Sequence, residues 1–599
     1  MKSIKKMIEI FKRVLPKSVN FKKIYLMAAI YSLSEIIILF IFSYYGIDKA
    51  FKENSVSLFI IVISAIVIIQ LTSNITFAIA FKNGNKVTKI VNIEVREKLF
   101  KKAMDLDKEY HNNHATGATI NTLVGDVEII GEGFFWPSMY LVINGVTIIT
   151  CYLICAIVNF KLSLIILACA PIILLITKLT FKMLNKIDDR RREARKKRLS
   201  HINDGIMGIK TIKTLNLEEK NNTEYDILCK NQARQEMNKH YLGQAIWRSI
   251  DLIVAIAIGV LFYLSYKEFI SLNISYGGLY LFFILFDRCL YSICAFSDNF
   301  DSFSEVLVSA EKIDNMLSLE PLVKDREKIN MNPETLRGKI EFKDLTFKYP
   351  KGEQVLTNFN LLVEPKSKVA LVGRTGSGKS TIASLIYRFY EPTKGQILFD
   401  DKDYLDLPQG FIRGNIGFIL QEAMLFDDSV LNNIRYGKRD ASEEDVIKVC
   451  KEIGLHEFIE KMPNKYDTKV GEGGLLLSNG QKQLIAFARV LLKNPDIVIL
   501  DEATSSIDSK TEQLIQNCIN NQFKDKTCIF IAHRLSTIKD VDNIVYLDKG
   551  TIIEQGNHRE LMDKKGRYYK LYTNQFYSKM LEAEQGLARE KKVEEAHGN

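Results

Sequence analysis

Cysteine is scarce in this chain, and none of the nine cysteines among its 599 residues belongs to a C-x-x-C pair. Five of them lie in long apolar stretches, at positions 151, 155, 169, 289 and 294. Cysteine in such surroundings packs as a small apolar side chain, whereas a metal site needs closely spaced ligands. The sequence therefore argues against a cysteine-based metal site, and it shows no N-terminal peptidase with a catalytic cysteine.

Charged residues are almost absent from six apolar runs in the first half of the chain. Each run is close to the about 20 residues that an α-helix needs to cross about 30 Å of hydrocarbon. The expected membrane spans are residues 24–45, 57–81, 137–160, 162–181, 250–266 and 276–297. An even number of spans leaves both ends of the chain on the same side of the membrane.

Lysine and arginine are rare in the short segments that join the spans on one side of the membrane. They are abundant in the longer segments, and seven of the nine residues at 190–198 are basic. The positive-inside rule therefore puts the long segments and both termini in the cytoplasm. We interpret the net charge of +10 as a result of membrane topology and contact with acidic lipids, and we expect no nucleic-acid partner.

The composition divides the chain into a membrane domain at residues 24–315 and a more polar domain at 338–577. Between them we expect a linker at 316–337. Residues 1–23 resemble a basic amphipathic elbow on the inner membrane surface, and we see no cleavable signal peptide. The charged tail at 578–599 is expected to be a solvated helix or disordered.

Two long segments between spans, 82–135 and 182–249, are too charged for the membrane and too periodic for linkers. Their periodicity predicts helices that extend from the bilayer into the cytoplasm.

The second domain contains a G-x-x-x-x-G-K-S loop between an apolar strand and a helix. Glycines let backbone N–H groups close around phosphate oxygens at a helix N-terminus. Lys379 can reach the β and γ phosphates of a nucleotide, and the Ser380 hydroxyl can bind Mg²⁺. The expected phosphate site comprises Gly373, Arg374, Thr375, Gly376, Ser377, Gly378, Lys379, Ser380 and Thr381.

A second apolar strand, at 497–500, leads into two carboxylates, Asp501 and Glu502. A buried strand of this kind can deliver Asp501 to the shell of a metal ion. Glu502 then faces a water molecule beside the γ-phosphate, as hydrolysis requires. The two motifs together predict an enzyme that hydrolyses a nucleoside triphosphate.

With the segment LSNGQ at 477–481, the chain resembles an ABC transporter, whose signature is LSGGQ. Further motifs follow in the order of that family. The resemblance implies that Tyr349 stacks on adenine, that Gln421 senses Mg²⁺ and the γ-phosphate, that Asp508 forms the D-loop, and that His533 contacts the γ-phosphate. The resemblance also implies that the signature residues contact the ATP that is bound to a partner subunit. These residues are Leu477, Ser478, Asn479, Gly480 and Gln481.

The fold class that the resemblance implies is an α-helical membrane domain with six spans and long cytoplasmic extensions, fused to an α/β P-loop ATPase of ABC type. Residues 468–474 are similar to a TxVGExG segment of exporters, so the chain resembles a half-transporter of the type I, or type IV, exporters. We expect ATP-driven export of a drug, lipid or peptide across a bacterial plasma membrane. An ATP-gated channel or a peptide-sensing module with the same fold is the alternative.

In this family each ATP lies between the phosphate loop of one subunit and the signature of the other, which implies a dimer. Asn479 replaces the first glycine of LSGGQ, where a side chain narrows the backbone freedom that glycine has. We prefer a homodimer, and a heterodimer with a second half-transporter remains open. Ionisable groups inside spans are costly, so Glu35, Asp287 and Arg288 are candidates for contact with substrate.

Overall fold

The computed structural model describes residues 9–11, 13–14, 21–270, 275–326, 335–350, 352–474, 476–501, 509–531 and 538–574. The chain divides into two compact units, Met1–Glu320 and Pro321–Asn599. The division falls within the segment that the sequence predicts as a linker.

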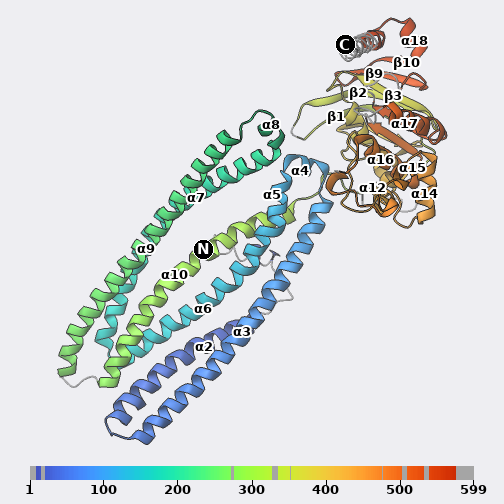
Figure 1. Cartoon of the computed structure of the whole chain (residues 1–599). Coiled ribbons are helices and arrows are strands. Elements are labelled where there is room, and N and C mark those ends of the chain that lie inside the picture. Colours follow the sequence, from blue (N-terminus) through green and yellow to red (C-terminus); the bar gives the residue numbers. More distant parts are fainter. Residues whose placement is uncertain are drawn as a thin grey trace, which may run out of the picture. The chain divides into compact units, whose positions relative to one another are not determined.

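The first unit consists of helices, six of which are long (Figure 1). Short helices lie at the turns between the long helices that reach into the expected cytoplasmic segments. In chain order the elements are α2 (Lys22–Ile41), η1 (Phe42–Phe51), α3 (Val56–Asp105), α4 (Lys108–Asn113), α5 (Thr116–Asn121), η2 (Thr122–Asp126), α6 (Val127–Val158), α7 (Phe160–Met207), α8 (Ile209–Thr214), α9 (Glu218–Ile270) and α10 (Tyr276–Ser318).

Side chains define where several long helices begin. Ser55, Asn159 and Ser275 precede α3, α7 and α10, and each accepts a hydrogen bond from a backbone N–H of the first turn. Such N-caps satisfy donors that have no partner inside the helix. η1 continues α2 as a π-helix, and its Asp48 accepts a hydrogen bond of 2.7 Å from the backbone N–H of Gly277.

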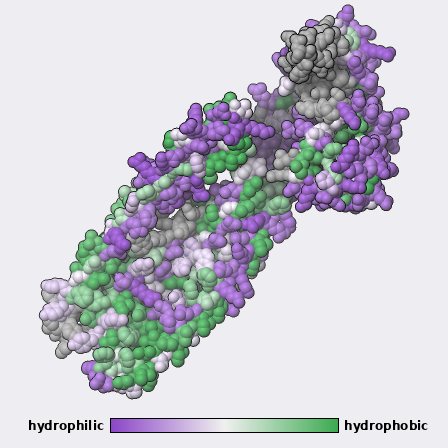
Figure 2. All heavy atoms as spheres, viewed as in Figure 1, coloured by the Kyte–Doolittle hydropathy of each residue, from purple (hydrophilic) through white to green (hydrophobic). Residues whose placement is uncertain are grey.

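Many apolar side chains of this unit are exposed, including Ile157 at 84% and Ile61 at 62%. Figure 2 shows apolar residues gathered toward the end of the unit where α2 leads into α3. Among the described residues, four helical stretches are long and apolar enough to cross a membrane: Lys22–Phe51, Val56–Asp105, Thr116–Val158 and Tyr276–Phe296. Shorter apolar stretches occur at Phe160–Ile173 and Asp251–Val260, so the count of six spans stays a prediction.

Three apolar side chains of the predicted N-terminal elbow, Ile10, Phe11 and Val14, are buried. They pack in one cluster with side chains of α3, α6 and α10. In the described part of the elbow, the apolar face is therefore covered by protein.

The second unit is built on two sheets. An antiparallel sheet in the order β2-β1-β4-β5 is formed by β1 (Ile340–Lys348), β2 (Gln354–Val363), β4 (Lys394–Phe399) and β5 (Lys402–Asp403). A six-stranded sheet in the order β10-β9-β3-β8-β7-β6 is formed by β3 (Lys368–Gly373), β6 (Ile416–Ile419), β7 (Ile497–Asp501), β8 (Thr527–Ile531), β9 (Asn543–Asp548) and β10 (Thr551–Gly556). Five of its strands run parallel, and β10 pairs antiparallel with β9.

The described residues of this unit also form eight α-helices. They are α11 (Lys379–Ile386), α12 (Gln409–Asn415), α13 (Val430–Arg435), α14 (Glu443–Glu452), α15 (His456–Glu460), α16 (Asn479–Lys493), α17 (Ser509–Asn521) and α18 (His558–Asp563). The side chains of β3 alternate between two cores: Ala370 and Val372 belong to one, and Val369 and Leu371 to the other. A parallel strand with both faces buried needs such an uninterrupted apolar sequence.

Candidate functional site

The loop between β3 and α11 depends on glycine. Gly376 and Gly378 have φ of 82° and 105°, a left-handed conformation that residues with a Cβ rarely adopt. A Cβ on Gly376 would meet no atom within 4 Å, so the backbone of the loop borders open space there. This is the cradle of backbone groups that an anion such as a nucleotide phosphate needs.

Lys379 is the first residue of α11, and only 4% of it is exposed. Its Nζ donates hydrogen bonds to the backbone oxygens of Gly373, at 2.8 Å, and Arg374, at 3.0 Å. These bonds hold the ammonium group over its own loop, at the N-terminus of a helix. A phosphate at this position meets both the positive charge and the positive end of the helix dipole.

Three side chains test whether the loop suits a phosphate group and Mg²⁺. The Ser377 hydroxyl is buried and has no hydrogen-bond partner in the described structure, so its donor is available to an oxygen anion. The Ser380 hydroxyl is on an exposed residue, and Asp501 at the end of β7 is half-buried. Hydroxyl and carboxylate oxygens are ligands that Mg²⁺ prefers. The residues therefore fit both groups.

The parallel strands bring distant motifs to one edge of the sheet. β3 lies beside β8, β8 beside β7, and β7 beside β6, with Leu371 opposite Ile531 and Asp501 opposite Ile531. The carboxyl ends of these strands therefore meet at the phosphate loop, where open α/β sheets bind ligands. Gln421 follows β6 by two residues and is exposed at this edge. Glu502, Asp508 and His533 lie outside the described residues.

Tyr349 is held by its aromatic neighbours. Its ring lies edge-on to Phe347, with centroids 4.9 Å apart, and to Tyr390, at 5.1 Å. Its hydroxyl is 3.0 Å from the Thr381 hydroxyl on α11. Contacts between aromatic edges and faces favour one ring orientation. The ring is thereby fixed beside the helix that starts at the phosphate loop.

The signature forms the start of α16. Ser478 is the N-cap, and its hydroxyl accepts a hydrogen bond from the backbone N–H of Gln481, whose side chain in turn accepts one from the backbone N–H of Ser478. This reciprocal capping box defines the end of the helix. Asn479, the first helical residue, is exposed and does not have the positive φ that would require glycine. The expected loss of backbone freedom at Asn479 therefore costs little here.

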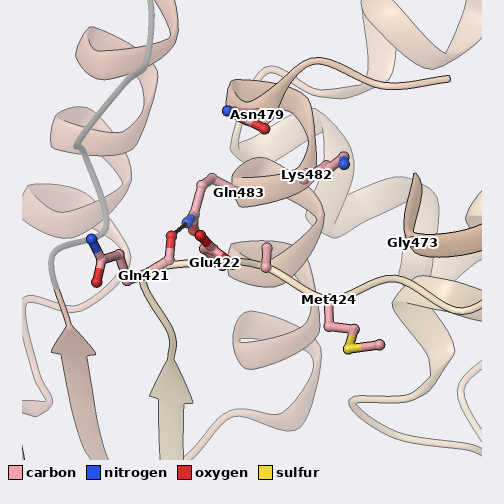
Figure 3. Close-up of a pocket in the computed structure, with 8 residues that line it drawn as sticks. Gln421, Glu422, Met424, Gly473, Asn479, Lys482 and Gln483 are labelled. Carbon is pink, nitrogen blue, oxygen red and sulfur yellow. Dashed lines mark hydrogen bonds between the residues drawn. The ribbon is translucent and has the colours of Figure 1, made fainter. Parts of the chain in front are cut away.

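A cavity of about 500 Å³ separates the signature helix from the loop that carries Gln421 (Figure 3). Gln483 closes one side of it and is only 4% exposed. Its Nε2 donates to the backbone oxygens of Gln421, at 2.6 Å, and Leu420, at 3.2 Å. The lining residues are Gln421, Glu422, Ala423, Met424, Gly473, Asn479, Lys482 and Gln483.

Farther along the same helix, Arg489 binds the continuation of that loop. Its guanidinium donates to the backbone oxygens of Met424 and Asn433, at 2.7 and 2.6 Å, and to the Asn433 side chain at 2.8 Å. Burial lowers the pKa of Arg489 from its ordinary value. Asn433 is fully buried and bonds three further backbone oxygens of residues 426–429. The loop after β6 is thus fastened to α16 and α13.

Comparisons with known proteins agree with this geometry. The family model for the ABC transporter transmembrane region matches residues 23–290, and a second family model, described as ABC transporter, matches residues 356–505. An ATP-dependent lipid A-core flippase of Legionella pneumophila is 32% identical over 493 residues, which cover 82% of this chain and 82% of that protein. This chain is an ABC transporter.

Another relative of the transporter is YgaD of Bacillus subtilis, whose name assigns it provisionally to multidrug export. It is 33% identical over 492 residues, or 80% of this chain and 83% of that protein. A solved structure of a bacterial Atm1-family ABC exporter with ATP bound has the same fold, with a TM-score of 0.80. It is 24% identical, and the match covers 94% of this chain and 99% of that chain. The predicted fold class, a helical membrane domain fused to an ABC ATPase, is confirmed.

The transporter's membrane unit brings together two of the three predicted substrate residues. Arg288 on α10 donates to Glu35 on α2 at 3.3 Å, and Gln70 on α3 donates to the other Glu35 oxygen at 2.9 Å. Asp287 is exposed and does not join this group in the described structure. Glu35 and Arg288 therefore compensate each other's charge, which lowers the cost of placing them within the membrane helices.

The sequence did not single out Gln483, Arg489 and Asn433. Gln483 and Arg489 bind backbone oxygens of residues that are more than fifty positions away in the sequence. No local sequence pattern indicates such contacts. The available signal was a glutamine among the otherwise apolar buried residues of the transporter's signature helix, and an arginine between two of those apolar residues.

Proposed function

We propose that two copies of this transporter together export an amphipathic substrate from a bacterial plasma membrane, with ATP and Mg²⁺ bound at the phosphate loop. The observation that carries the proposal is the meeting of the phosphate loop, Gln421 and Asp501 at the carboxyl edge of one parallel sheet. The family supports hydrolysis of ATP coupled to transport.

Lys379 and the N–H groups of the phosphate loop bind the β and γ phosphates. Mg²⁺, held by Ser380, Gln421 and Asp501, supplies positive charge to the phosphate oxygens. Glu502 accepts the proton of the attacking water, and His533 contacts the γ-phosphate, where negative charge develops. Tyr349 stacks on adenine. These roles rest on the position of each residue in the motif order, and Ser377 adds a buried hydroxyl donor.

The signature completes the site of the other copy. Ser478 and Asn479 are exposed at the N-terminus of α16, a 15-residue helix whose dipole favours anions. Leu477, Gly480 and Gln481 belong to the same turn, and the Gln481 side chain is already used in the capping box. One chain therefore offers a phosphate loop to its own ATP and a signature to the ATP of its partner.

ATP drives export by favouring one conformation. If two ATP molecules bind the closed pair of ATPases more tightly than the open pair, the difference in affinity shifts the membrane helices from inward-open to outward-open. Hydrolysis removes that difference and lets the pair reopen. Both termini and the ATPases face the cytoplasm in this scheme, as the basic segments indicate.

The substrate has a large apolar part. The exposed large side chains of the apolar parts of the membrane helices include many isoleucines, leucines, phenylalanines and tyrosines, and the Glu35–Arg288 pair adds a polar group. The relatives include proteins named as lipid A-core flippases and one named provisionally as a multidrug exporter. A lipid, drug or hydrophobic peptide agrees with both observations, with Glu35, Asp287 and Arg288 as the contacts for its polar part.

Inverted membrane vesicles test the proposal. Vesicles with the wild-type chain should accumulate a fluorescent amphiphile, either a lipophilic dye or a labelled phospholipid, only when ATP and Mg²⁺ are added outside. Lys379→Ala should insert normally and abolish uptake, because it removes a charge-assisted contact to phosphate. ATP-independent passage of ions or solutes down their gradient would instead support a gated channel, and normal uptake by Lys379→Ala would contradict the assigned ATP site.

A further inference from the structure

Arg388 is the most deeply buried charged residue of the described ATPase unit, with an exposed fraction of 0%. Its guanidinium donates to the Glu391 carboxylate at 2.9 and 3.2 Å and to the Leu407 backbone oxygen at 2.8 Å. It also faces the ring of Tyr404, 5.8 Å from the centroid. Burying an arginine is costly unless its donors are satisfied, so a site this complete holds Arg388 in one place.

The remaining donors of Arg388 bind a segment next to the membrane unit in sequence. We call residues 321–326 the connector, because they begin the ATPase unit and are separated from Ser318, the last residue of α10, by only two residues. Arg388 donates to the Lys324 backbone oxygen at 3.1 Å and to the Asp325 carboxylate at 3.3 Å. Both belong to the ATPase unit, so the connector is part of that fold and not a free linker.

Gln409 makes the attachment of the connector two-sided. Its backbone N–H donates to the same oxygen of Asp325 at 3.0 Å, and its side chain donates to the Val323 backbone oxygen at 3.4 Å. Arg326 adds an ion pair with Asp406 at 2.6 Å, in which both side chains are about half exposed. Exposed pairs contribute little, so the buried Arg388 is the main anchor.

Arg388 is also attached to the phosphate loop, through α11. That helix begins at Lys379 and ends at Ile386, two residues before Arg388. The backbone N–H of Arg388 donates to Leu385 at 3.0 Å, and that of Phe389 donates to Ser384 at 2.9 Å, so the turn closes the helix. All side chains of α11 except that of Ser380 are buried. Packed interiors transmit displacement, and eight helical residues span about 12 Å.

We propose that Arg388 is a positioning residue that joins the connector to the C-terminal end of the phosphate-loop helix. A displacement of the phosphate loop when ATP binds is passed along α11 to Arg388, then to the backbone of residues 323–325, and along the chain to α10. This route runs through the covalent connection between the units, and it adds to any contact that the cytoplasmic turns of the membrane unit make.

Asp325→Ala tests the proposal better than removal of Arg388, because Glu391 still compensates the buried charge. The Asp325 side chain is 40% exposed, so the substitution should leave the fold intact. In the full chain in lipid nanodiscs, hydrogen–deuterium exchange is compared with and without ATP and vanadate. In the wild type both residues 373–391 and the end of α10, residues 306–318, should change their exchange. Lys324→Ala is the matched control, because it keeps the backbone oxygen that Arg388 uses.

In Asp325→Ala we expect ATP turnover within about twofold of wild type, as for a surface substitution. The response of residues 373–391 should remain, and that of residues 306–318 should fall at least about twofold, the smallest effect expected when a coupling contact is lost. Asp325→Glu should restore part of the response of residues 306–318. An unchanged response of α10 in Asp325→Ala, or no response of α10 in the wild type, would overturn the proposal. So would an equal loss of both responses with a lower unfolding temperature, because the network would then be structural only.

Discussion

Glu502 is the residue on which the chemistry of the proposed ATP site depends most. It directly follows Asp501, the last residue of β7. Glu502→Gln keeps the size of the side chain and removes the proton acceptor, so we expect ATP binding to persist and steady-state hydrolysis to fall about 10²–10⁴-fold. Phosphate release by the purified protein measures the rate, and Glu444→Gln, on the exposed face of α14, is the control. A variant with most of the wild-type turnover would exclude Glu502 as the general base.

At this scale the sequence predicts those residues whose role follows from their neighbours in the chain. Lys379 and the glycines around it are recognisable because one loop and one helix start make the whole cradle. Arg388 is not recognisable in this way. Its partners at 324, 325, 391 and 407 come from three separate segments, and its burial depends on the complete fold. The pairing of Arg288 with Glu35, over 250 positions away, is hidden for the same reason.

Helix α16 is an element with two tasks, because it carries the signature at its start and holds the Gln421 loop by Gln483. Gln483→Leu would leave the backbone oxygens of Leu420 and Gln421 without their donor, at a cost of about 1–3 kcal/mol. We expect Gln421 to be displaced and the Mg²⁺ concentration for half-maximal ATPase activity to rise about tenfold, which corresponds to about 1.4 kcal/mol. A titration of ATPase activity with Mg²⁺ at fixed ATP measures this change.

Lys482→Gln is the matched control for Gln483→Leu, because Lys482 lines the same cavity from the next position of the helix. A similar change in both variants would point to a general effect on α16. An unaltered Mg²⁺ requirement in Gln483→Leu would show that Gln421 does not need this support.

Among the elements, the sequence predicts those with a strong period or a local cap. The S-x-x-Q pattern at 478–481 is a readable helix start, and the charged periodic segments become the outer parts of α3, α7 and α9. The π-helical form of η1 is not predictable, because its ten residues are as apolar as an ordinary helix and differ only in hydrogen-bond spacing. Sheet order is equally hidden, since β3 pairs with strands that follow it by more than 150 residues.

The number of copies in the working transporter is a property of the whole molecule. For a homodimer, both ATP sites use Asn479, and native mass measurement of the chain expressed alone should show two copies with ATPase activity. Asn479→Gly should change turnover by no more than about twofold, because Asn479 already has ordinary helical backbone and glycine there costs only part of a kcal/mol. A monomer without activity, not rescued by glycine, would instead require a second kind of half-transporter.

The central position of β3 also has a consequence for biosynthesis. The phosphate loop is translated shortly after the membrane helices, but its strand stays without neighbours until residues 527–531 and 543–548 have left the ribosome. During that interval a strand with two apolar faces is exposed, a state in which nascent chains aggregate or recruit chaperones. A premature stop codon before residue 543 therefore yields helices that enter the bilayer beside an unfinished ATPase, and such a product becomes a target for proteolytic quality control rather than a slower pump.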